Sequence, residues 1–198
     1  MDKIKEQKII NNTVGFTLVE FIVVLVILAI LAAFTIPAML GFVEDARSKA
    51  SITLTREVYT AAQSAATELF NQIGGENLAD GNTDNINGFK EKVGKKIQTL
   101  TAGDINFTKV VTGDGANTPA AAKRDFIEVA IRYSEGDSYK SSEFKYPNSA
   151  KVWFDRKDKD SGQFVVKAVW YVDKEGKYRI IILEDSKKGI STTVEKIK

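Results

Sequence analysis

The stretch that decides the fold is residues 15–43, which read GFTLVEFIVVLVILAILAAFTIPAMLGFV. Between Phe16 and Phe42 the only charged residue is Glu20, whereas the rest of the chain has the mixed composition of an ordinary soluble domain. Roughly 20 mostly apolar residues are enough to cross a bilayer as a helix. A helix that is apolar on every side must be buried, either in lipid or in protein. The stretch therefore predicts a helix that spans a membrane or lies in the core of an assembly.

Residues 1–15 precede the apolar stretch and carry Lys3, Lys5 and Lys8. A secretory signal peptide places its small-residue cleavage site after the apolar region. Here the small residue Gly15 comes before that region, so a cut behind the run would discard the hydrophobic segment. Positively charged flanks stay on the cytoplasmic side of a membrane span. We therefore expect a cytoplasmic N-terminus and an external C-terminal domain.

Glu20 is the one carboxylate in the apolar stretch. An ionised side chain in a membrane segment is costly, and such a residue is a functional candidate whose partner has to be named. A cut after Gly15 would supply the partner, because Phe16 would then carry a positive amine close to Glu20 in the sequence. In a staggered bundle of helices, one subunit's amine can lie beside another subunit's Glu20, so that the charge pair sets the register. The alternative is that Glu20 lies at the membrane interface and reaches water there.

Pro37 lies inside the pattern of this helix, and Gly41 follows it. Proline removes one backbone hydrogen bond and clashes with the preceding turn, so it kinks or breaks a helix. Two interpretations remain open. The segment is either one kinked helix, or a membrane helix that ends at Pro37 with a separate helix after it.

The motif G-F-T-L-V-E at residues 15–20, followed by the apolar run and Pro37, resembles the prepilin signature of type IV pilins and related pseudopilins. The resemblance implies cleavage between Gly15 and Phe16 by a membrane aspartyl prepilin peptidase, and methylation of the new Phe16 amine. It further implies that three residues act in filament assembly, namely Thr17, Glu20 and Pro37.

The resemblance also implies a division of the chain into three parts. These are a leader peptide at 1–15, a transmembrane and filament-core helix at 16–42, and an amphipathic helix with an extracellular α+β head at 43–198. The match covers only about the first fifty residues. The chain departs from many pilins in lacking the Cys pair that closes their C-terminal region.

The sequence from Val43 to Phe70 is amphipathic, because apolar residues recur at steps of three and four. The predicted buried face consists of Val43, Ala46, Ala50, Leu54, Val58, Ala61, Ala65 and Leu69. Phe16 to about Phe70 can therefore form one long helix. The many alanines of this face favour packing against a sheet over a two-helix coiled coil.

The C-terminal part predicts a sheet. Gly74-Gly75 ends the helix, and residues 74–125 predict a long surface connection, with short pieces such as Gly88–Leu100 that can form a turn of helix. Strand patterns follow at Phe126–Tyr133, Lys151–Phe154, Phe164–Val172, Tyr178–Leu183 and, as an edge strand, Ile190–Ile197. Residues 173–176 suit a hairpin. The predicted fold is α+β and pilin-like: a long N-terminal helix, apolar in its first half, packed against a C-terminal antiparallel sheet of four or so strands.

The composition limits the kinds of catalytic and metal-binding site that the chain can form. The chain has no Cys and no His, which excludes disulfides and removes the commonest general base and metal ligand. A net charge of +2 gives no reason to expect nucleic acid as a partner. One cluster invites comparison with a Ca²⁺ loop, namely Asp155, Asp158, Asp160 and Gly162. Interleaved basic residues, and Val169 where a last acidic ligand is needed, favour a solvated turn. We predict no enzyme activity, no cofactor and no bound metal.

These observations lead us to expect the structural subunit of a type IV pilus filament that serves surface adhesion or motility. The precursor is expected in the inner or cytoplasmic membrane, and the mature subunit in an extracellular filament. The expected partners are prepilin peptidase, the pilus assembly machinery, the membrane and further copies of the chain. Two alternatives remain: a pseudopilin of a type II secretion or competence system, and an uncleaved single-pass membrane protein with an extracellular binding domain. A membrane-anchored enzyme finds no catalytic motif to support it.

Overall fold

The computed structural model describes residues 15–73, 83–112, 124–132, 144–156, 163–185 and 187–197. They form two compact units, Met1–Asp45 and Ala46–Lys198. The first unit contains the beginning of helix α1, and the second, called the head below, contains the rest of α1 and all other described elements. The predicted α+β class, with a long N-terminal helix and a C-terminal sheet, is confirmed.

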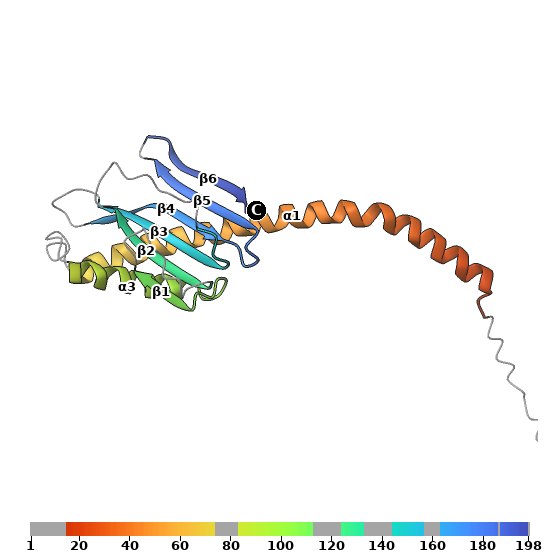
Figure 1. Ribbon diagram of the computed structural model, residues 1–198, viewed down its shortest axis with the longest axis horizontal. Helices are drawn as coiled ribbons and strands as arrows, with labels where there is room; N and C mark the ends of the chain where they lie inside the picture. The colour runs from red at the N-terminus through yellow and green to blue at the C-terminus, as the bar shows by residue number, and fades with distance from the viewer. Residues whose placement is uncertain are drawn as a thin grey trace, which may run out of the picture. The chain divides into compact units, whose positions relative to one another are not determined.

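Helix α1 runs from Leu18 to Ile73 without interruption (Figure 1). The alternative of two helices separated at Pro37 is therefore wrong, since Pro37 lies inside α1. Proline cannot donate to the carbonyl one turn earlier. In the same region Thr35 donates its hydroxyl hydrogen to the Leu31 carbonyl oxygen at 2.7 Å.

The buried face of α1 begins later than the sequence indicates. Val58, Ala61, Ala65 and Leu69 are buried as predicted, but Ala46 and Ala50 are exposed. Burial begins at two polar residues that the apolar pattern did not include, Ser51 and Thr55. Their hydroxyl groups donate to the carbonyl oxygens of Arg47 and Ser51, at 3.0 and 2.7 Å, so both are buried with a hydrogen bond made.

Helix α3 occupies Thr83–Leu100, within the region that the sequence reading assigned to a surface connection. That reading was wrong here, because Gly88, Gly94 and three asparagines or aspartates at its start mask the helical pattern. The apolar residues still recur at helical spacing, and all of them except the terminal Leu100 are buried: Ile86, Phe89, Val93 and Ile97. At Gly94 an added Cβ would clash with Cγ1 of Val110, so glycine lets α3 approach the neighbouring strand closely.

The sheet has six strands in sequence order, β1-β2-β3-β4-β5-β6 (Figure 1). Their bounds are β1 Lys109–Thr112, β2 Phe126–Arg132, β3 Ser149–Arg156, β4 Phe164–Val172, β5 Tyr178–Asp185 and β6 Gly189–Lys196. The prediction of a wholly antiparallel sheet is wrong, because β1 pairs with β2 and β2 with β3 in parallel. The remaining three pairs are antiparallel. A parallel pair needs a long crossover connection, and local strand patterns do not reveal which strands are joined that way.

The predicted hairpin after β4 is confirmed. The Gly176 N–H donates to the Asp173 carbonyl oxygen at 2.9 Å, and Gly176 has a φ of 74°. The Tyr178 N–H donates to Oδ1 of Asp173 at 2.7 Å, so the aspartate closes the turn. A side chain at position 176 would be strained by its φ and would also contact the Pro147 ring.

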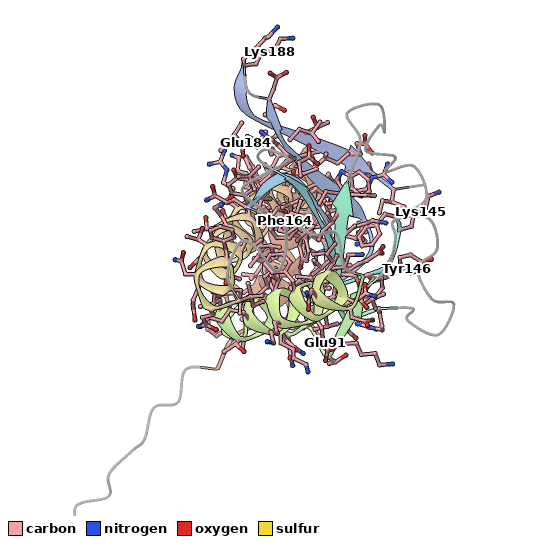
Figure 2. All side chains as sticks on the ribbon, turned by 90° about the vertical axis from the view of Figure 1, so that its left-hand side faces the viewer. Glu91, Lys145, Tyr146, Phe164, Glu184 and Lys188 are labelled. Atoms are coloured by element: carbon pink, nitrogen blue, oxygen red, sulfur yellow. The ribbon has the colours of Figure 1, made fainter. Side chains whose placement is uncertain are left out.

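One face of the sheet packs with the buried sides of α1 and α3 in the main core of the head. Strand alternation supplies this face, for example Ile127, Val129 and Ile131 of β2. Phe89 of α3 contacts Phe164 of β4 with ring centroids 4.9 Å apart. In Figure 2, Phe164 lies inside the head, whereas Glu91 lies at the surface of α3.

The other face of the sheet carries a second, aromatic cluster. Its buried members are Val111, Phe126, Phe144, Trp170, Val172 and Ile181. The cluster encloses an ion pair between directly opposed residues of β2 and β3: Nζ of Lys151 lies 2.8 Å from Oε1 of Glu128. Their side chains are only 6% and 0% exposed. The Lys151 Nζ also lies 4.8 Å from the ring centroid of Trp153, at cation–π distance.

Candidate functional site

The predicted processing and assembly residues lie at the beginning of α1. Gly15, Phe16 and Thr17 precede the helix, and Phe16 is 86% exposed. The Gly15–Phe16 bond therefore lies in exposed, non-helical chain. This is the backbone state in which a peptidase can reach a peptide bond.

Thr17 and Glu20 are brought together by reciprocal hydrogen bonds. The Thr17 N–H donates to Oε2 of Glu20 at 2.8 Å, and the Thr17 hydroxyl donates to the same oxygen at 2.7 Å. In return, the Glu20 N–H donates to Oγ1 of Thr17 at 3.2 Å. This is a capping box, in which residues N-cap and N3 satisfy each other's free N–H groups at a helix start.

The capping box changes the interpretation of Glu20. The sequence reading named a partner only in a cleaved neighbouring subunit, whereas the structure provides one within the chain, Thr17. A carboxylate in the first turn is also favoured by the helix dipole. The signature T-x-x-E at residues 17–20 is readable from the sequence as a helix start.

The structure leaves Pro37 apart from the capping box, further along α1. Of the predicted residues, it therefore brings together Thr17 and Glu20, with Phe16 directly before them. Both capping bonds to the carboxylate use Oε2. The capping geometry thus occupies one oxygen of an exposed carboxylate.

The first half of α1 presents apolar side chains on every side. Every described residue from Gly15 to Arg47 is exposed. The large hydrophobic side chains from Phe16 to Val43 are 45–86% exposed. Within the described residues, α1 is the one helix long and apolar enough to cross a membrane. A continuous apolar surface of this kind marks a region that lipid or protein covers.

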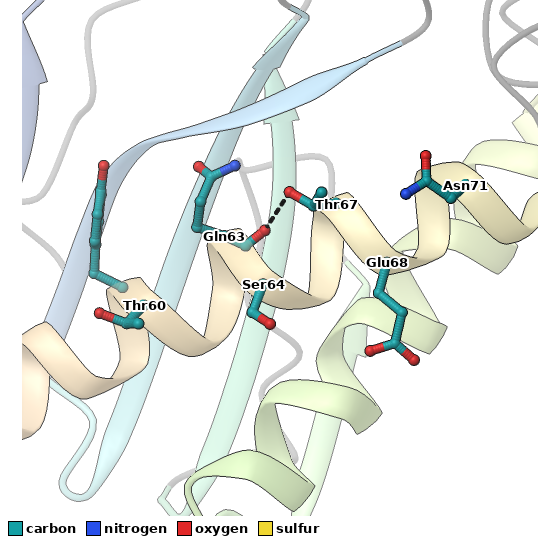
Figure 3. Close-up of a pocket in the computed structure, with 7 residues that line it drawn as sticks. Thr60, Gln63, Ser64, Thr67, Glu68 and Asn71 are labelled. Carbon is teal, nitrogen blue, oxygen red and sulfur yellow. Dashed lines mark hydrogen bonds between the residues drawn. The ribbon is translucent and has the colours of Figure 1, made fainter.

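A shallow groove in the head runs along the polar side of α1 (Figure 3). Its lining consists of Tyr59, Thr60, Gln63, Ser64, Thr67, Glu68 and Asn71. Several of these groups are already bonded within the head. The Thr67 hydroxyl donates to the Gln63 carbonyl oxygen at 2.9 Å, and Oε1 of Gln63 accepts the Val166 N–H at 3.1 Å. The first bond lies within α1 and the second fixes α1 against β4, so these groups have a structural role.

Tyr59, at one end of this groove, is held in its protonated form. Its hydroxyl donates to Oε2 of Glu184 at 2.7 Å. Partial burial, and then this bond to a carboxylate, raise the pKa of Tyr59 to about 12. A phenol with this pKa does not act as a base or nucleophile near neutral pH.

A polar network closes one end of the sheet. Nδ2 of Asn148 donates to Oδ1 of Asp125 at 2.9 Å, and the Tyr171 hydroxyl donates to Oδ1 of Asn148 at 3.2 Å. Asp125 and Asn148 both have positive φ angles, 58° and 49°, which Asp and Asn tolerate. Burial, reinforced by the nearby carboxylates, raises the pKa of Tyr171. The network joins the starts of β2 and β3 to β4 and leaves the phenol protonated.

The Ca²⁺ comparison rests mainly on residues outside the described part of the chain. Asp155 lies on β3, and Asp158, Asp160 and Gly162 are not among the described residues. Among the residues that the structure describes, no group of three or more acidic side chains is placed to hold a metal ion. The prediction of a solvated turn stays a prediction.

A comparison of the chain with protein-family models, with curated proteins and with solved structures finds no match.

Proposed function

We propose that this chain is the structural subunit of a type IV pilus filament. The precursor is cleaved between Gly15 and Phe16, the new amine is methylated, and the subunits assemble through the first half of α1. The observation that carries the proposal is the combination found at the start of α1. A helix apolar on all sides begins with a Thr17–Glu20 cap directly after an exposed Gly-Phe bond, and the same helix continues into the head core.

The exposed apolar surface explains why such a subunit polymerises. In the membrane, lipid covers the side chains from Phe16 to Val43. Once a subunit leaves the lipid, the same side chains must be covered by the equivalent helices of other copies, or they would face water at a cost of roughly 25 cal/mol per Å². The proposed partners therefore follow from the surface: the cytoplasmic membrane, the assembly machinery that extracts the subunit, and further copies of the chain.

The proposed orientation places the N-terminus inside and the head outside. The lysines before residue 15 support it through the positive-inside tendency. In the filament the head lies on the outer surface, where adhesion or motility takes place. Its role is structural, consistent with the protonated state of Tyr59 and Tyr171 in its polar regions.

The first test is the N-terminal mass of the protein taken from its native host, measured by peptide mass spectrometry. The proposal expects a mature chain that begins at methylated Phe16. An intact Met1 would overturn it and favour the uncleaved single-pass membrane protein. Cleavage behind the apolar run would also overturn it, because the assembly segment would be lost. A methylated Phe16 in a protein that never appears in surface filaments would favour the pseudopilin alternative.

A further inference from the structure

The two edges of the sheet differ in length. Strand β1 has four residues and packs against α3. Strand β6 has eight, and each of them pairs with a residue of β5, from Tyr178↔Lys196 to Asp185↔Gly189, without a register shift. No described strand pairs with the far side of β6. Natural proteins usually shorten, bend, charge or cover such an edge, because it can pair with another strand.

The hydrogen-bond pattern between β5 and β6 defines which backbone groups of β6 face outward. The Ile197 N–H donates to the Lys177 carbonyl oxygen at 2.8 Å. In an antiparallel pair, residues alternate between those bonded to the neighbouring strand and those whose N–H and C=O point away. The odd-numbered residues of β6 therefore bond to β5. The N–H and C=O groups of Ile190, Thr192 and Val194 point to the open edge.

The same positions carry exposed apolar side chains. Beyond the first half of α1, the described large hydrophobic residues that are exposed are Leu100, Ile190 and Val194. Ile190 is 59% and Val194 is 37% exposed. Both lie on the sheet face of Ile180 and Ile182, as the register Ile180↔Val194 shows. Residues 190–194 contain no charged residue and no proline that would protect the edge.

We propose that β6 pairs antiparallel with β6 of a second copy of this chain, with Thr192 on the two-fold axis. This register places each Ile190 opposite Val194 of the other copy, which gives two apolar cross-strand pairs. A shift by two residues would place Ile190 opposite Thr192 or Lys196 instead. A shift by one residue would set outward-facing groups against groups already bonded to β5. The register with Thr192 on the axis is therefore the one in which the outward N–H and C=O groups find partners and the exposed apolar side chains are covered.

This pairing goes beyond the proposed filament and does not depend on it. A two-fold contact uses the same surface on both copies, so it closes after two copies and cannot extend a filament. It also sets the two β6 strands in opposite directions. It would join the heads of two subunits side by side. Figure 2 shows Lys188 at the tip of the β5–β6 hairpin, and the exposure of Ile190 and Val194 beside it shows that this edge is accessible.

The absence of cysteine from the chain allows a direct test. In an antiparallel bonded pair the Cα atoms are about 5.5 Å apart, within the roughly 4.4–6.8 Å that a disulfide spans. We expect full-length Thr192→Cys, purified in detergent micelles, to form disulfide dimers several-fold faster than Thr193→Cys. The second position faces Ser191 of the other copy and so lies off the axis. Thr193 is exposed and Thr192 is half-buried. If dimers formed by random collisions, Thr193→Cys would therefore cross-link faster than Thr192→Cys.

A second variant separates edge pairing from contacts through α1. Ile190→Lys adds a charge to a side chain that is mostly exposed, so the head should keep its fold, which circular dichroism and the Tm check. In the Thr192→Cys background this change should slow dimer formation several-fold. Equal rates at positions 192 and 193 overturn the proposal, as does a Thr192→Cys rate that Ile190→Lys leaves unchanged. Adding Glu20→Ala distinguishes the two proposals, because it should reduce filament assembly and leave this cross-link intact.

Discussion

Oε2 of Glu20 lies 2.8 Å from the backbone nitrogen of Thr17 and 2.7 Å from its hydroxyl oxygen. One carboxylate oxygen thus satisfies the first free N–H of the long helix and also fixes the threonine hydroxyl, which accepts the Glu20 N–H in return. The charge of Glu20 and its ability to accept hydrogen bonds are separate properties. Only the second is needed for the cap, and variants can separate them.

Glu20→Gln should preserve the cap, because glutamine serves at this position of a capping box, while removing the charge. If the proposed pair with a neighbouring amine sets the register, Glu20→Gln and Glu20→Ala should reduce filament yield alike. The yield of sheared surface filaments, measured against total cellular subunit, checks this. A Glu20→Gln mutant that assembles at the wild-type level would assign the residue to the cap alone. Thr17→Val is the matched control, since it removes a cap worth about 1 kcal/mol but keeps the charge.

Lys151→Met should strongly destabilise the head. It removes the cation 2.8 Å from Glu128, whose side chain is fully buried. Breaking a buried pair from one side typically costs about 3–5 kcal/mol, whereas replacing both partners with apolar residues is often neutral or stabilising. Urea unfolding, followed by tryptophan fluorescence, should therefore rank Lys151→Met well below the double variant Glu128→Leu/Lys151→Met. Equal loss in both variants would show that the pair contributes through packing instead of charge.

Gly94→Ala should destabilise the head although alanine favours helices. Its Cβ would clash with Val110 Cγ1, so α3 and β1 would have to move apart. Gly88 lies in the same helix with no neighbouring atom within 4 Å of an added Cβ. Gly88→Ala should therefore be neutral or raise stability by up to about 1 kcal/mol. Thermal unfolding of both variants tests the contrast, and Val110→Ala should partly restore a Gly94→Ala head.

Glu57 should make the head less stable as the pH rises. Burial, and then the neighbouring Asp104 carboxylate, raise the pKa of Glu57 above its ordinary 4.5. The folded state thus binds the proton more tightly than the unfolded state. The contribution is fully present below pH 4.5 and is lost as the pH rises through the raised value. Glu57→Gln should remove this loss, so its Tm advantage over wild type should be larger at neutral pH than in acid.

The quantity to measure is the difference in Tm between Glu57→Gln and the wild-type protein at each pH. Carboxylates such as Asp185 and Glu175 have lowered pKa values, caused first by hydrogen bonds from the Lys187 N–H and from Lys177, respectively. Their stabilising contribution is lost as the pH falls, which opposes the effect of Glu57. A Tm difference that does not change with pH would contradict the raised pKa of Glu57.

Local sequence patterns predicted those helices and strands in which apolar side chains recur at one clear spacing. The helical recurrence of Val58, Ala61, Ala65 and Leu69 predicted the core side of α1, and β4 was predicted at its observed bounds of Phe164–Val172. Helix α3 was predicted only as a turn of helix within Gly88–Leu100, because Gly88 and Gly94 lower helix propensity, although Gly94 is required by its contact with Val110. The parallel pairs were missed because strand direction depends on how connections cross, which the pattern within a strand does not encode.

Part of the candidate site was predictable and part was not. Residues 17–20 carry a readable capping-box signature, whereas the processing role of Gly15 and Phe16 and the assembly role of Glu20 are implied by the resemblance and stay predictions. The buried Glu128–Lys151 pair was not foreseen, since charged residues alternating along a strand normally indicate a solvent-facing side. Here Phe126 of the same strand and two aromatic residues from other segments, Phe144 and Trp170, cover that side. Coverage of this kind is a property of the tertiary structure.

The continuity of α1 has a mechanical consequence. Its apolar beginning and the residues Val58–Leu69 inside the head core belong to one continuous helix, Leu18–Ile73. A pull on the apolar end therefore acts directly on the interior of the head. Without any cysteine, no disulfide shares that load. Such a pull is opposed by the packing of the buried face of α1 in the main core of the head.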